Sequence, residues 1–119
     1  MYENRENQIN YIEIQARDLG VARDFFGRMF GWEFEDWGPD YMAFKDGRLE
    51  GGFAKSDKAA TTEGGSVLLI FYAEDLEASM EKVVDCGGEI VRDIVEFPGG
   101  RRFQFADPNG NEFAIWSDK

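Results

Sequence analysis

Residues 105–116, FADPNGNEFAIW, predict two strands joined by a tight turn. Positions 107–110 hold aspartate, proline, asparagine and glycine, which favour turns, and apolar residues stand on both sides. We expect the side chain of Asp107 to cap this turn. The turn then determines the register of the last strand, in which Glu112 and Ala114 point to the same face.

The second half of the chain extends this pattern toward the N-terminus. Residues 66–72, SVLLIFY, form a near-continuous apolar run that predicts a strand. Asp75 is a suitable N-cap for a helix with apolar residues at helical spacing, and the glycines at 87–88 end that helix. Further strands are expected near 89–97, 102–106 and 111–117.

The first half repeats this order of elements. A strand is expected at 9–16, a helix from the N-cap Asp18 to about Phe30, and strands near 32–36, 41–45 and 49–55. The two N-caps are 57 residues apart, and so are the glycines Gly31 and Gly88. This repetition predicts a duplicated unit of one strand, one helix and three strands. We expect one domain over 1–119, with module one at about 8–55, a linker at about 56–65 and module two at about 66–117.

Composition limits the functional classes. A chain of 119 residues with 43% hydrophobic residues suits one domain with a real core. The formal charge of −11 argues against binding to nucleic acids or anionic membranes. The absence of histidine excludes histidine-based catalysis and metal sites, and the single cysteine, Cys86, excludes an intramolecular disulfide. Residues 1–10, MYENRENQIN, lack the apolar core of a signal peptide, so we expect a cytoplasmic location.

Three stretches together resemble one known superfamily: 10–34, NYIEIQARDLGVARDFFGRMFGWEF; 65–90, GSVLLIFYAEDLEASMEKVVDCGGEI; and 105–116. This is the vicinal-oxygen-chelate superfamily, which includes glyoxalase I, bleomycin-resistance proteins and extradiol dioxygenases. The resemblance implies an α+β fold in which tandem βαβββ modules form a curved mixed sheet around a concave pocket, with the helices outside, and commonly a homodimer. A ferredoxin-like sandwich is the alternative, but it has fewer strands after each helix.

The resemblance also locates the metal ligands of the superfamily, which are usually histidines and glutamates. Three ligand positions fall on Tyr11, Leu68 and Ala114, and the fourth falls in LEGGF, at Gly51. Leucine, alanine and glycine side chains cannot bind a divalent cation, and a phenol is a poor substitute for imidazole. We therefore expect neither a metal site nor a cofactor.

Glu13 and Glu112 leave another possibility open. Each lies two residues from a ligand position, so Glu13 shares the face of Tyr11 and Glu112 that of Ala114. The two carboxylates would form an oxygen-rich site for magnesium, calcium or manganese, or one of them would act as a general base. A simpler interpretation places both in water near the ends of their strands.

In the concave pocket that the resemblance implies, strand alternation places aromatic and apolar side chains with a few polar groups, which suit a small hydrophobic or aromatic molecule. The expected lining residues are Tyr11, Glu13, Trp37, Tyr41, Phe53, Leu68, Ile70, Tyr72, Arg102, Glu112, Ala114 and Trp116. Three functions remain open: a metal-free protein that binds such a molecule; a lyase, isomerase or hydrolase that uses Glu13 or Glu112; and a protein whose dimer surface matters more than its cavity.

Overall fold

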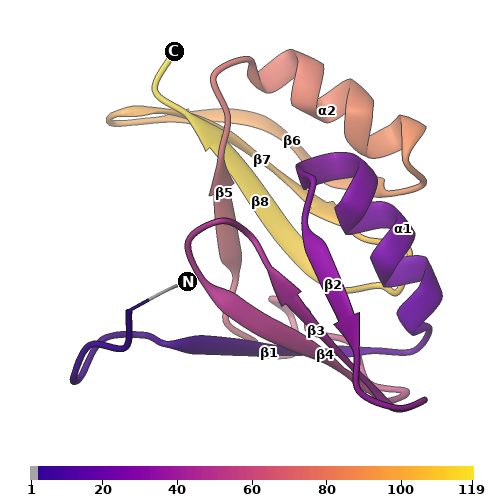
Figure 1. Ribbon diagram of the computed structural model, residues 1–119. Helices are drawn as coiled ribbons and strands as arrows, with labels where there is room; N and C mark the ends of the chain where they lie inside the picture. Colours follow the sequence, from indigo (N-terminus) through magenta and orange to yellow (C-terminus); the bar gives the residue numbers. More distant parts are fainter. Residues whose placement is uncertain (1–2) are drawn as a thin grey trace. The chain divides into compact units, whose positions relative to one another are not determined.

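Two consecutive βαβββ modules make up the computed structural model, which describes residues 3–119 (Figure 1). The first module contains β1 (Tyr11–Ala16), α1 (Leu19–Phe30), β2 (Glu33–Asp36), β3 (Tyr41–Lys45) and β4 (Glu50–Lys55). The second contains β5 (Leu69–Tyr72), α2 (Leu76–Asp85), β6 (Glu89–Phe97), β7 (Gly100–Ala106) and β8 (Glu112–Ser117). The chain divides into two compact units between Lys58 and Ala59, and each unit holds one module. The α+β class and the duplicated order of elements are confirmed.

Helix α1 begins and ends where the sequence predicts. The carboxylate of Asp18 accepts a hydrogen bond from the Val21 amide at 3.1 Å, which satisfies one free N–H group of the first turn. Gly31 follows the helix with a φ of 70°, a left-handed conformation that glycine adopts without strain. Between these ends, Phe25 and Phe26 are fully buried and anchor the helix in the core of its module.

The first sheet has the strand order β1-β4-β3-β2, with β1 parallel to β4 and the other pairs antiparallel. Side chains alternate between its two faces. One face packs against α1, where the ring centroid of Phe53 lies 5.4 Å from that of Phe26 and Trp32 stacks on Phe44 at 4.2 Å. The opposite face carries Tyr11 and has no helix of this module over it.

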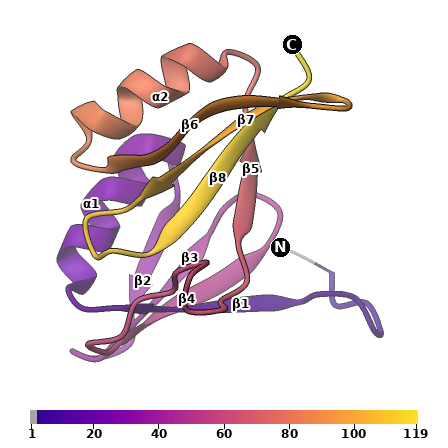
Figure 2. The ribbon, with the colours of Figure 1, turned by 180° about the vertical axis from the view of Figure 1, so that it is seen from behind.

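The second sheet repeats this topology with the order β5-β8-β7-β6, and β5 is parallel to β8 (Figure 2). Asp75 caps α2 by accepting a hydrogen bond from the Ala78 amide at 3.0 Å. Leu76 and Val83 of α2 are fully buried, as is Phe103 of β7. No helix within residues 3–119 is long and apolar enough to cross a membrane.

The segment before β5 is attached to the last strand. The amide of Glu112 donates a hydrogen bond to the carbonyl oxygen of Ala60 at 2.8 Å, and the Ala60 amide donates to the Asn111 side chain at 2.7 Å. Strand β5 correspondingly begins at Leu69 rather than at 66, and Val67 is 81% exposed. The apolar run forms a strand only in its second half because the amide of Glu112 is already bonded to Ala60 where β8 begins.

Candidate functional site

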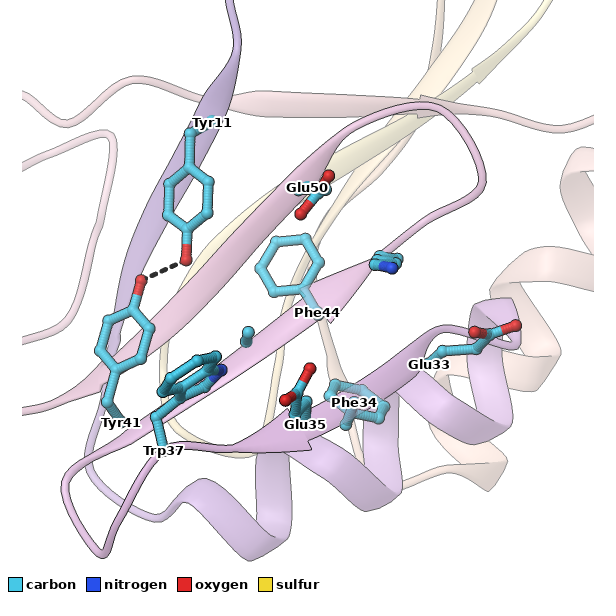
Figure 3. Close-up of a pocket in the computed structure, with 10 residues that line it drawn as sticks. Tyr11, Glu33, Phe34, Glu35, Trp37, Tyr41, Phe44 and Glu50 are labelled. Carbon is cyan, nitrogen blue, oxygen red and sulfur yellow. Dashed lines mark hydrogen bonds between the residues drawn. The ribbon is translucent and has the colours of Figure 1, made fainter. Parts of the chain in front are cut away.

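A cavity of about 490 Å³ opens on the first sheet, on the face that α1 does not cover (Figure 3). Residues from all four strands and from the turn after β2 line it, and they all belong to the first module. The lining residues are Tyr11, Glu33, Phe34, Glu35, Trp37, Tyr41, Ala43, Phe44, Lys45 and Glu50.

The centre of this face carries almost no side chain. In the sheet register Ala43 of β3 lies opposite Gly52 of β4, and Glu35 and Glu13 are the next residues outward in the same row. A methyl group on Gly52 would overlap the hydroxyl group of Tyr41. Two neighbouring small residues therefore leave the space that the surrounding larger side chains enclose.

Aromatic side chains form part of the cavity wall. Trp37 is 64% exposed and Tyr11 is 44% exposed. The hydroxyl groups of Tyr11 and Tyr41 form a hydrogen bond of 2.5 Å (Figure 3). Burial and the hydrogen bonds with Tyr11 and Glu13 raise the pKa of Tyr41 above its ordinary value, so its hydroxyl group stays protonated at neutral pH. The two phenols are thus linked by a hydrogen bond on one side of the cavity.

Three carboxylates accompany the aromatic residues. Glu33 and Glu50 lie on either side of Lys45 in the register of β2, β3 and β4, and Glu35 lies beside Ala43 in the next row. Within residues 3–119, none of these three glutamates forms an ion pair. The cavity therefore combines an aromatic wall with carboxylates that are available to a ligand.

The sheet places Phe53 outside this cavity, although the sequence predicted it in the lining. Phe53 is fully buried on the side of α1, where its ring lies 5.4 Å from Phe26. Its neighbour Gly52 points to the cavity face, toward Tyr41 and Tyr11. Because successive residues of a strand point to opposite faces, Phe53 belongs to the core.

The expected ligand position Gly51 also needs correction. A methyl group on Gly51 would overlap the ring of Phe44 and a backbone oxygen of β1, which places Gly51 on the side away from the tyrosines. Gly52 pairs with Glu13, as Ala114 pairs with Ile70 in the second sheet, so Gly52 is the counterpart of Ala114. A shift of one residue along a strand changes the face. The correction leaves glycine at that position, and glycine has no side-chain donor.

Neither Glu13 nor Glu112 lines the cavity of the first module. Glu13 lies near Tyr41 and contributes to the raised pKa of that phenol, and it is not among the residues that line the cavity. One oxygen of Glu112 accepts hydrogen bonds from the amide and the hydroxyl group of Thr62, at 2.8 and 2.9 Å. These bonds, and the bond from the Glu112 amide to Ala60, attach the segment before β5 to the start of β8.

Three other predicted residues surround a depression of the second module, and this depression has a volume of about 450 Å³. They are Leu68, Arg102 and Glu112, which lie with Thr62, Val91, Arg92 and Gln104. Arg102 donates a hydrogen bond to the side-chain oxygen of Gln104 at 3.2 Å. The polar side chains of this depression are largely occupied by one another.

The remaining predicted residues lie on β5 and β8. Ile70 and Tyr72 are about half exposed, and the ring of Tyr72 lies 5.2 Å from that of Trp116 in an edge-to-face arrangement. The hydroxyl group of Tyr72 donates to Asp118 at 2.6 Å, and this bond raises the pKa of Tyr72 to about 12. Ala114 is fully buried.

Sequence reasoning missed most of the polar lining of the first-module cavity. Glu33 and Glu35 alternate in the segment EFED, and Lys45 shares the face of Tyr41 in the segment YMAFK. Period-two alternation would have placed these side chains on one face. The position of Glu50 beside Tyr11 depends on the pairing of β1 with β4, which no local pattern reveals.

The positions that the resemblance assigned to metal ligands do not carry a set of metal-binding side chains. Within residues 3–119, no group of three or more histidine, cysteine, aspartate or glutamate side chains is placed to hold a metal ion. The sheet places Tyr11 at the cavity, Leu68 in the second-module depression and Ala114 in the core.

Comparison with known proteins agrees with this architecture. The sequence model of the Glyoxalase/Bleomycin resistance protein/Dioxygenase superfamily matches residues 8–115. The chain belongs to this superfamily. Its fold is also similar to that of the genomically encoded fosfomycin resistance protein FosX from Listeria monocytogenes, with a TM-score of 0.78 over 95% of this chain and 94% of that one, at 17% identity.

Two curated proteins are similar in sequence to this glyoxalase-superfamily chain. Protein CFP32 of Mycobacterium bovis is 25% identical over 122 residues, which cover 96% of this chain and 47% of that protein. The anthracycline biosynthesis protein DauV of a Streptomyces species is 25% identical over 114 residues, which cover 90% of this chain and 40% of DauV. The chain thus spans about half the length of these relatives.

Proposed function

We propose that this glyoxalase-superfamily chain binds a small hydrophobic or aromatic molecule without a metal ion. The cavity of the first module carries this proposal. Trp37 and Tyr11 expose ring surface at its wall, and Ala43 leaves its centre open. Aromatic walls with a few polar groups are typical of sites for small organic molecules.

The side chains at the metal positions support a metal-independent function. Gly52, Leu68 and Ala114 have no side-chain donor atom, and Tyr11 is engaged with Tyr41. Divalent ions need several oxygen, nitrogen or sulfur ligands in one place. Metal analysis of the purified protein, with melting curves in magnesium, calcium and manganese, tests this part. A stoichiometric metal or a distinct melting shift would contradict it.

The enzymatic alternative assigns Glu13 and Glu112 as base or metal ligands in a lyase, isomerase or hydrolase. The placement of both carboxylates favours the binding function, because Glu112 holds Thr62 and Glu13 does not line the cavity. A general base needs a free acceptor within reach of its substrate. Turnover of a small carbonyl compound that Glu13→Gln abolishes in a folded protein would reverse this preference.

Binding is tested with neutral planar probes, tryptophol and 2-naphthol, by calorimetric titration. Trp37→Ala and Tyr11→Ala should each weaken binding about tenfold, because each removes an aromatic wall. Tyr72→Ala is the matched control, since Tyr72 is exposed to a similar extent on the corresponding strand of the second module. Absence of binding at about 10 mM, or binding that neither wall variant changes, would contradict the proposal.

Two further expectations belong with this proposal. The superfamily resemblance implies a homodimer, and light scattering of the purified chain measures that state directly. The composition predicts a cytoplasmic location, which fluorescence of a tagged chain in its own cells would check.

A further inference from the structure

The side chains that line the first-module cavity carry a net charge. The inference drawn from this charge rests on the proposed binding function. The lining contains the carboxylates Glu33, Glu35 and Glu50 and one cation, Lys45. The lining therefore carries a net charge of −2 at neutral pH. Because no ion pair within residues 3–119 involves these glutamates, a cationic group of a ligand would not have to displace an existing partner.

The distribution of these charges matters more than their sum. Lys45 lies between Glu33 and Glu50 in one row of the register, at about 5 Å from each neighbouring strand position. Glu35 lies in the next row, where its partner is the uncharged Ala43. The half of the cavity near Glu35 is therefore acidic, because no cation lies in the same row of the register as Glu35.

The aromatic wall is at this acidic half. Trp37 follows Glu35 by two residues, and the amide of Trp37 donates to the carbonyl oxygen of Tyr41 at 3.0 Å. Figure 3 shows Trp37, Tyr41 and Glu35 around the same part of the cavity. The face of an aromatic ring attracts a cation through its quadrupole, and a carboxylate close to the ring adds a charge-assisted hydrogen bond.

The tyrosine pair contributes a hydrogen-bond acceptor. A phenol hydroxyl group has one proton to donate and two lone pairs that can accept. The hydroxyl groups of Tyr11 and Tyr41 share one hydrogen bond of 2.5 Å, in which either oxygen can be the donor. In either direction of this bond the oxygen of Tyr11, at the cavity wall, keeps a lone pair for a ligand. Tyr11, Glu35 and Glu50 therefore all present acceptors, and the matching ligand must present donors.

We infer that the first-module cavity selects an organic cation, namely a planar aromatic molecule that bears a protonated amine. The ring stacks against Trp37 and Tyr11, and the ammonium group lies between Glu35 and Glu50, where carboxylates and the Tyr11 oxygen accept its three N–H donors. Lys45, between Glu33 and Glu50 in the register, disfavours a second positive group in that row. An anionic analogue meets net repulsion, because the three glutamates of the lining outnumber its one cation, Lys45.

Three indole probes of similar size test this inference by calorimetric titration: tryptamine is cationic, tryptophol is neutral and indole-3-propionate is anionic. Tryptamine should bind about tenfold more tightly than tryptophol, and indole-3-propionate should bind most weakly. Added salt should weaken binding of tryptamine and leave that of tryptophol nearly unchanged, because ions screen the attraction.

The double variant Glu35→Gln/Glu50→Gln should remove the preference for tryptamine. Glu63→Gln/Glu89→Gln is the matched control, since it changes the net charge equally at exposed positions outside the cavity. A preference that both double variants reduce equally would mean that overall charge causes it, and the inference would fail.

The inference and the proposed function fail in different ways. If tryptophol binds as tightly as tryptamine and Trp37→Ala weakens both, the cavity binds aromatic molecules without selecting cations, and only the inference is overturned. If none of the three probes binds in a manner that depends on Trp37 at about 10 mM, both are overturned.

Discussion

The two modules share their topology but use the same sheet position in different ways. In the first module Tyr11 pairs with Glu50 across β1 and β4. In the second, Leu69 pairs with Phe113, so the preceding residues Leu68 and Glu112 occupy the corresponding position. The Glu50 side chain faces a cavity and forms no ion pair within residues 3–119, whereas that of Glu112 binds Thr62.

The reason for this difference is the chain segment next to each position. Residues 60–62 run beside the start of β8, and their amide and hydroxyl groups use the acceptors of Asn111 and Glu112. The open face of the first sheet has small residues at its centre instead. Duplication of a fold thus repeats the backbone, while the neighbouring segment decides whether a carboxylate is structural or available to a ligand.

The largest expected effect is a difference in stability between substitutions on the two faces of β4. Gly51→Ala should lower the free energy of unfolding by about 3 kcal/mol, because the added methyl group meets the ring of Phe44 and a backbone oxygen of β1. Gly52→Ala should cost about 1 kcal/mol or less in stability, because its methyl group meets the ends of the side chains of Tyr41 and Tyr11, which can move. Urea denaturation measures both, and equal losses would contradict the assignment of Gly52 to the cavity face.

A second comparison concerns the turns that precede β4 and β8. Asp46 and Asp107 each accept two backbone hydrogen bonds with one oxygen, but Asp46 is exposed and Asp107 is only 4% exposed. The second carboxylate oxygen of Asp107 is buried without a hydrogen-bond partner. Burial raises the pKa of Asp107 to about 6.

The raised pKa of Asp107 should make unfolding depend on pH. Between about pH 4 and 6 Asp107 keeps its proton in the folded protein, whereas the unfolded chain has released it. The stability that the protonated Asp107 contributes is therefore present at low pH and is lost as the pH rises through 6. Asp107→Asn keeps the oxygen that caps the turn and cannot ionise. Relative to the original chain, this variant should gain roughly 2 kcal/mol between pH 4 and 7.

Asp46→Asn is the control for this measurement, since Asp46 caps its turn in the same way at the surface. Its stability relative to the original chain should change less over the same pH range. Equal pH dependence of the two variants would mean that the burial of Asp107 has no electrostatic cost. Chemical denaturation at pH 4, 5, 6 and 7 provides the data.

The smallest expected effect concerns Glu112 and Glu50, which occupy corresponding positions of the two sheets. Glu112→Gln should lower stability by about 1 kcal/mol, because a neutral amide oxygen is a weaker acceptor for the two bonds from Thr62. Glu50→Gln should change stability by less than about 0.5 kcal/mol, since no ion pair is lost. Hydrogen exchange of the Thr62 amide should accelerate only in the first variant. Acceleration in both would show that the two positions are not distinct.

Local signals in the sequence determined the elements and their duplication. Asp18 and Asp75 cap the two helices and the turn at 107–110 precedes β8, as predicted, and Gly31 follows α1 in a left-handed conformation. Each of these features depends on a few neighbouring residues, so a sequence pattern is enough to identify it. The same patterns carry the resemblance to the superfamily.

Only the tertiary structure decided which side chains share the candidate site. Phe53 was predicted in the lining but lies in the core, and Glu50 lies beside Tyr11. The register of β1, β3 and β4 determines both positions. The partner of Glu112 lies 50 residues earlier in the chain, at Thr62. Pairing between distant segments leaves no periodic trace in either segment, and a register shift of one residue reverses every face, so composition and alternation alone do not specify the site.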